Sequence, residues 1–93
     1  MEDIKIKNIQ IRILPQRDSL LGFCSFEIFD MFRVSGCALH TKRDGGIKIL
    51  FPAKKVKESL QFYFQPLSPE IHEIIQRKVE ERVKELGFFD AVL

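Results

Sequence analysis

The chain has no tryptophan and only two cysteines, and its apolar runs fall far short of the roughly 20 residues that a membrane-spanning helix needs. Its start has no basic segment followed by an apolar one, so we expect no signal peptide. Cys24 and Cys37 have no metal-ligand spacing, and in the cytoplasm, where we expect this protein, a disulfide between them is disfavoured. These absences predict a cytoplasmic protein with free thiols and no metal ion or other cofactor.

The sequence also lacks a recognisable catalytic constellation. His40 and His72 lie far apart and have no Cys, Asp or Glu at ligand spacing, so we interpret both as surface or packing residues. The pair Gly45-Gly46 lacks the strand–loop–helix context and the following Lys-Ser or Lys-Thr of a phosphate-binding loop. We therefore expect that the protein is not an enzyme. An acid–base pair assembled across the fold is an alternative that the sequence leaves open.

The 93 residues suffice for one domain, which we place at residues 1–93. They include nine phenylalanines, an unusual number for so short a chain. Aromatic rings can fill a core that would otherwise be thin, because a small domain buries only a modest share of its surface. We expect most of the rings in the core, and an exposed aromatic patch is the alternative.

Apolar and polar residues alternate over residues 4–14, which predicts a strand with one buried face. The phase of this alternation slips after Ile6, so we expect a β-bulge near Lys7-Asn8. The next strand, over residues 20–29, is apolar on both faces, which is typical of a central strand covered on both sides. The remaining strands and loops are predicted as a loop at 15–19, a strand at 32–40, a hairpin loop at 41–46, a strand at 47–51, a basic loop at 53–59 and a strand at 60–65.

An amphipathic helix is predicted over residues 69–86. Ser68 is a good N-cap, Pro69 suits the first helical position and Gly87 is the natural stop. One apolar stripe recurs at helical spacing, at Ile71, Ile74, Ile75, Val79, Val83 and Leu86. The expected fold class is therefore α+β: an antiparallel sheet of four to five strands followed by a C-terminal amphipathic helix.

Basic residues gather in the middle of the chain. Between residues 42 and 57 one acid, Asp44, stands against six bases, namely Lys42, Arg43, Lys48, Lys54, Lys55 and Lys57. The two basic loops leave opposite ends of the strand at 47–51, about 15–20 Å apart. Charge alone therefore leaves two interpretations open, solvated loops or a site for a polyanion.

Residues 32–75 resemble the SpoVG family, the stage V sporulation and septation regulators. The resemblance lies in Phe32-Arg33-Val34, in the Asp44-Gly45-Gly46 loop, and in an apolar strand that runs into Pro52-Ala53-Lys54-Lys55. An aromatic segment, Pro66 and the C-terminal helix follow in the family's order. The chain departs from the family at Ser35-Gly36, where the family has a His-Asp pair, and at Gln61 and Gln65, where it has a basic residue and a histidine.

The resemblance implies a homodimeric regulator that binds DNA or RNA with little sequence preference, in sporulation, septation or transcription. It assigns phosphate contact to Lys54 and Lys55, and we add Lys57, with Lys42 and Arg43 as a second contact. A basic loop fixed at a strand end can position a protein on phosphates. The alternative is a protein-interaction module that docks a partner through the aromatic strand at 62–64 or through the apolar tail at 88–93.

Overall fold

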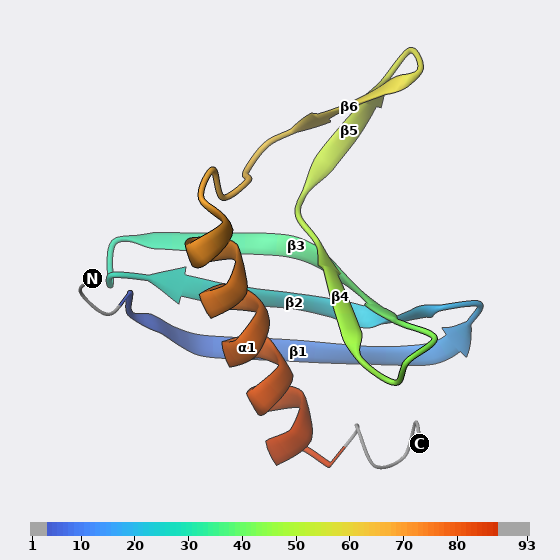
Figure 1. The fold of residues 1–93 in the computed structure, drawn as a ribbon, viewed down its shortest axis with the longest axis vertical. Coiled ribbons are helices and arrows are strands. Elements are labelled where there is room, and N and C mark those ends of the chain that lie inside the picture. Colours follow the sequence, from blue (N-terminus) through green and yellow to red (C-terminus); the bar gives the residue numbers. More distant parts are fainter. Residues whose placement is uncertain (1–3, 88–93) are drawn as a thin grey trace.

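The computed structural model describes residues 4–87. Four strands form an antiparallel sheet in sequential order, two more form a separate hairpin, and a helix follows (Figure 1). This arrangement confirms the predicted α+β class. In chain order the elements are β1 (Ile6–Arg17), β2 (Leu20–Ile28), β3 (Phe32–Thr41), β4 (Ile47–Leu50), β5 (Ala53–Val56), β6 (Ser59–Phe62) and α1 (Pro69–Glu85).

Two bulges flank the middle of β2. On one side the register of β1 shifts between Lys7 and Gln10, and Asn8 adopts a φ of 51°. This confirms the bulge predicted near Lys7-Asn8. On the other side, Ser35 and Gly36 of β3 together stand opposite one residue of β2, and Gly36 has a φ of 78°. Such insertions bend a strand and increase its local twist.

The predicted loop at 15–19 is mostly wrong, because β1 continues through Pro15 to Arg17 and turns only at Asp18 and Ser19. Strand order explains why proline is tolerated there. β1 lies at the edge of the sheet, so a residue without an N–H group costs no hydrogen bond where it faces away from β2. The register is irregular between Ile13 and Arg17, as expected around such a residue.

The helix forms as predicted and covers one face of the sheet. Ser68 is the N-cap, and its hydroxyl oxygen accepts hydrogen bonds from the backbone N–H groups of Glu70 (3.1 Å) and Ile71 (3.5 Å). The side-chain amide of Gln76 donates to the backbone carbonyl of Ile47, which ties α1 to the edge strand β4. Within residues 4–87, no helix is long and apolar enough to span a membrane.

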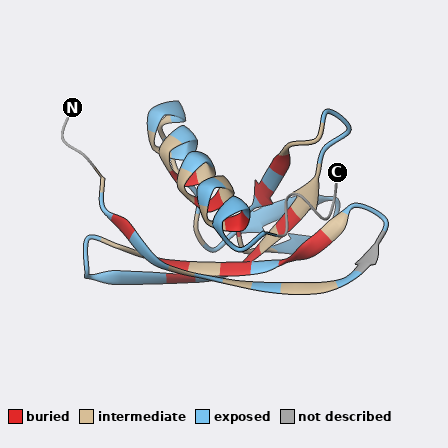
Figure 2. Cartoon of the chain, turned by 90° about the horizontal axis from the view of Figure 1, so that it is seen from below, coloured by how far each residue is buried: buried red, intermediate tan, exposed pale blue. Residues whose placement is uncertain are grey.

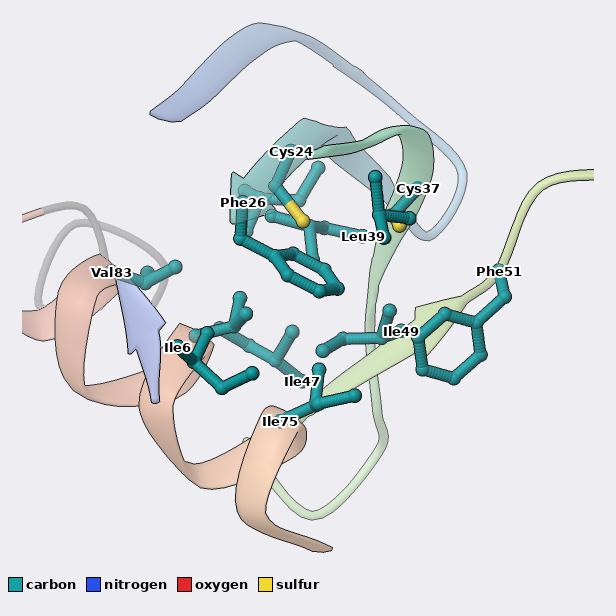
Figure 3. Close-up of a cluster of buried hydrophobic side chains, with 13 residues drawn as sticks. Ile6, Cys24, Phe26, Cys37, Leu39, Ile47, Ile49, Phe51, Ile75 and Val83 are labelled. Atoms are coloured by element: carbon teal, nitrogen blue, oxygen red, sulfur yellow. The ribbon is translucent and has the colours of Figure 1, made fainter. Parts of the chain in front are cut away.

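The core lies between the helix and the inner face of the sheet (Figures 2 and 3). The apolar stripe of α1 supplies Ile75, Val79 and Val83, each fully buried. The strands contribute alternate residues, as their period of two requires. These are Ile6, Leu21, Cys24, Phe26, Val34, Cys37, Leu39, Ile47 and Ile49, with Phe51 just after β4.

The prediction that β2 is covered on both faces is wrong. β2 is central in the sheet, but the described elements cover only the inner face (Figure 2). Phe23 points to the other face and is 40% exposed, and Phe29, in the turn after β2, is 46% exposed. The expectation that most phenylalanines fill the core is also wrong for the described residues, where Phe26 and Phe51 are buried but Phe23, Phe29, Phe32 and Phe62 are exposed.

The predicted basic loop at 53–59 is wrong as well. Residues 53–56 are a strand that pairs with residues 59–62 as a tight hairpin, and the following strand ends at Phe62 rather than at Gln65. Alternation does not reveal β5, because three of its four side chains are exposed and two of them are lysines. A strand of a projecting hairpin has little or no buried face, so it lacks the pattern by which strands are predicted.

Candidate nucleic-acid interface

The hairpin of β5 and β6, which we call the arm (residues 53–62), projects from the sheet beyond β4 (Figure 1). Its strands pair from Ala53 opposite Phe62 to Val56 opposite Ser59. Lys57 adopts a φ of 58° in the turn, and the Ser59 hydroxyl donates to the Val56 carbonyl (3.1 Å). Within the described residues, neither strand of the arm packs against another strand or the helix. The arm therefore presents most of its surface to solvent.

The three lysines of the predicted primary site all lie on the arm. Lys54 and Lys55 are consecutive in a strand, so their side chains point to opposite faces of the hairpin, and Lys57 lies at its tip. All three are exposed, and none of their side-chain ammonium groups has a hydrogen bond or ion pair to another described residue. The structure thus brings these lysines together on one element but spreads their charges around it.

The predicted second contact, Lys42 and Arg43, is not joined to the first. Both residues lie in the loop between β3 and β4, at the end of β4 opposite to the arm (Figure 1). The Lys42 Nζ atom lies 3.9 Å from Asp44 Oδ2, and the loop is closed by a hydrogen bond from the Lys42 N–H to the Gly46 carbonyl (2.8 Å). Part of the Lys42 charge is therefore balanced within the loop.

The histidines and cysteines take structural places. His40 Nδ1 and the Ser19 hydroxyl are 2.9 Å apart, and the His72 ring packs edge-on against Phe51 at 5.5 Å. Cys24 and Cys37 are cross-strand neighbours in the core, both free and buried. Their hydrogen bond and their burial raise the pKa of the Cys24 thiol. Among residues 4–87, no cluster of three or more His, Cys, Asp or Glu side chains is arranged to hold a metal ion.

An apolar groove lies where the arm meets the sheet. It has a volume of about 610 Å³ and is formed mainly by apolar side chains of β2, β3 and the segment after the arm. Its lining residues include Ile28, Phe32, Val34, Pro52, Tyr63 and Phe64. Tyr63 is 69% exposed and Leu60, on β6, is 63% exposed. The groove includes Tyr63 and Phe64 of the aromatic segment at 62–64, which the sequence offers as a docking site for a protein partner.

Sequence reasoning missed a further polar surface on the uncovered side of the sheet. We call it the open face and define it by Gln10 and Arg12 of β1, Phe23 and Ser25 of β2, Arg33 and Ser35 of β3, and Lys48 and Leu50 of β4. Register places Arg12 beside Phe23, and Gln10 beside Ser25. The alternation of Gln10 with Ile11 and Arg12 signals this face, but the sequence does not reveal that the other described elements leave it uncovered.

Comparison with known proteins adds no assignment: the chain matches no protein-family model, and a search of curated proteins finds no significant relative.

Proposed function

We propose that this chain is a nucleic-acid-binding regulatory protein, without enzymatic activity, that contacts phosphates through the lysines of the arm. The observation that carries the proposal is that Lys54, Lys55 and Lys57 project together from the core without a partner among the described residues. Exposed ammonium groups on a projecting hairpin can reach a phosphate backbone without rearrangement of the core. The resemblance to the SpoVG family supports the same assignment.

The form of the arm favours binding with little sequence preference. Lysine is a point charge that neutralises phosphates, whereas base recognition needs side chains placed in a groove or against unstacked bases. The helix does not offer a recognition surface, because the centre of its apolar stripe is buried and its exposed side carries charges of both signs. We expect binding that depends steeply on salt, as counterion release requires.

An electrophoretic mobility-shift series with DNA and RNA of unrelated sequences, at two salt concentrations, tests the proposal. We expect shifts with several sequences at low salt, and marked weakening at the higher concentration. Absence of a shift with every nucleic acid at low salt would contradict the proposal. Binding that is insensitive to salt would instead favour a surface other than the arm lysines.

We further propose that the protein is a homodimer. An isolated two-stranded hairpin is only marginally stable in water, and the arm has no packing partner among the described residues. Within the same residues, one edge of β3 is unpaired over positions 32–37, since β4 pairs only with residues 38–41. Unpaired edges and exposed apolar side chains are surfaces that a second copy can cover.

Sedimentation at micromolar concentration measures this assembly directly. The chain has a mass of 10.9 kDa, so we expect a species of twice that mass. Replacing Leu60 on the arm by Glu should shift the dimer towards monomer, because it places a charge on an apolar surface. A single species of monomer mass for the parent would refute the homodimer.

A second candidate function rests on the apolar groove beside Tyr63 and Phe64. A protein partner that inserts an apolar segment there would bind without strong dependence on salt. The apolar tail at 88–93, the other docking segment suggested by the sequence, lies outside the described residues. The salt series above separates this candidate from nucleic-acid binding.

A further inference from the structure

The open face holds a shallow hollow centred on β2. The hollow has a volume of about 490 Å³ and lies over the bulge of β3, where Ser35 and Gly36 stand opposite a single residue of β2. The residues of the open face that line it are Gln10, Arg12, Phe23, Ser25, Arg33 and Ser35. The charged side chains in this lining are two arginines, with no carboxylate.

The guanidinium group of Arg33 is held in place at one side of this hollow. Its Nη2 atom donates to the Gln10 side-chain carbonyl (2.7 Å) and to the Ser25 hydroxyl (3.0 Å), and its Nη1 atom donates to Glu27 Oε2 (3.2 Å). Glu27 in turn accepts from the Asn8 side-chain amide (2.9 Å), which belongs to the bulge of β1. Hydrogen bonds to side chains of β1 and β2 thus preorganise this planar cation.

Phe23 and Arg12 complete the surface. The Phe23 ring belongs to the central strand and is 40% exposed, and register places Arg12 directly beside it on the neighbouring strand. The Arg12 side chain is exposed, and its guanidinium group has no hydrogen bond or ion pair to any other described residue. The hollow is thus lined by an exposed ring, by the free guanidinium group of Arg12 beside it and by the fixed guanidinium group of Arg33. This lining matches the needs of a nucleotide, which presents a flat base and an anionic phosphate.

We propose that the open face is a stacking site for one base of a single-stranded nucleic acid, with Phe23 beneath the base and Arg12 on the adjacent phosphate. This inference rests on the proposed nucleic-acid binding and adds the class of substrate and a second surface. Single strands are bound by aromatic side chains on which bases stack, combined with cations that follow the backbone. A duplex cannot offer a base face to such a ring without unstacking.

The chemistry of the hollow favours this ligand over a second copy of the chain or an apolar peptide. The Arg12 guanidinium and the Ser35 hydroxyl in its lining have no partner among the described residues, so an apolar partner would leave them without hydrogen bonds at a cost in free energy. The Arg33 charge is balanced by Glu27, but the unpaired positive charge of Arg12 suits phosphate. The apolar side chains that suit a protein partner gather instead at the groove beside the arm.

Phe23→Ala, Phe23→Leu and Phe23→Tyr in the full chain test the proposal, with Phe29→Ala as a matched control. Phe29 is exposed to a similar extent but lies in the turn after β2, away from the hollow. Affinity is measured with oligo-uridine and oligo-thymidine that carry a fluorescent base analogue, whose emission reports stacking, and with a duplex. Thermal unfolding confirms that each variant is folded, and sedimentation gives its assembly.

We expect Phe23→Ala and Phe23→Leu to bind single strands about 5- to 150-fold more weakly, the range for loss of one stacked base. Phe23→Tyr and Phe29→Ala should bind like the parent, and duplex affinity should not change.

The stacking site is refuted if the parent binds single strands and Phe23→Leu binds equally well with the same change in emission. That result would leave the proposed phosphate contact of the arm lysines unaffected. If the parent binds no nucleic acid, both proposals fail. If Phe23→Leu changes the assembly and not the affinity, the stacking site is refuted and the open face is a contact between copies.

Discussion

Replacing Lys54, Lys55 and Lys57 together by alanine will weaken binding to DNA and RNA by a similar factor for every sequence tested. On B-DNA, each lost phosphate contact reduces the magnitude of the slope of log K against log salt by up to about 0.9. Near 0.1 M salt this corresponds to a roughly five- to tenfold loss of affinity for each contact. The variant should fold normally, because exposed charges contribute little to stability. Fluorescence anisotropy over a series of salt concentrations measures both effects.

Two substitutions provide matched controls for this result. Glu58→Ala removes the acid next to the lysines in the turn of the arm, so it should leave affinity equal or higher. Arg77→Ala removes an exposed positive charge from the helix and should have little effect. A triple lysine variant with the affinity and salt slope of the parent would place the phosphate contact elsewhere and would strengthen the protein-interaction alternative.

Ile75→Ala will lower the free energy of unfolding by about 2–4 kcal/mol, which is typical of a buried isoleucine truncated to alanine. Ile75 is fully buried at the centre of the helix stripe and lies in the core with Ile47 and Phe26 (Figure 3). The decrease includes the transfer free energy of the removed methyl and methylene groups and the cavity that remains. Urea denaturation of the parent and the variant measures this change in the free energy of unfolding. Both are compared at the same protein concentration, because assembly contributes to stability.

Glu81→Ala is the control for this prediction, because Glu81 is exposed on the opposite side of the same helix. It should change the free energy of unfolding by less than about 0.5 kcal/mol. Equally small effects for both variants would mean that α1 does not pack against the sheet through the stripe at Ile75, Val79 and Val83.

The helix is predictable from the sequence because its signals are local. Ser68 caps the first turn with its own hydroxyl. The centre of the predicted stripe, Ile75, Val79 and Val83, is buried as its spacing requires, whereas Leu86 at its end is 40% exposed. The bulge at Asn8 is also predictable, because a residue inserted in a strand shifts the phase of its alternation. In these cases neighbouring residues alone determine the structure.

The errors have causes that lie outside the local sequence. Pro15 suggests the end of a strand, but the edge position of β1 in the sheet allows a proline there. Phe23 suggests a core residue, because a strand with apolar residues on both faces does not reveal whether a second layer exists. The β5 half of the arm suggests a loop because this strand has no buried face. Each error depends on which surfaces the rest of the chain covers.

The candidate site is predictable as a set of residues but not as a shape. Charge identifies the lysines at 54, 55 and 57, and the structure places them on a projecting hairpin rather than in a loop. Their separation from Lys42 and Arg43 follows from the length of β4, as the sequence predicts. The open face is not identifiable in this way, because its residues come from four strands and meet only through the register of the sheet.

Nuclear magnetic resonance of the isotope-labelled chain, titrated with a single-stranded oligonucleotide at low salt, tests the central claim most directly because it locates the contact. We predict that amide signals of residues 54–57 shift first and most, that signals around Phe23 shift with them, and that added salt reverses both. Signals of the exposed helix side, such as Arg77, should stay unchanged. Shifts confined to the helix, or no shifts in the arm at saturating oligonucleotide, would contradict the proposed interface.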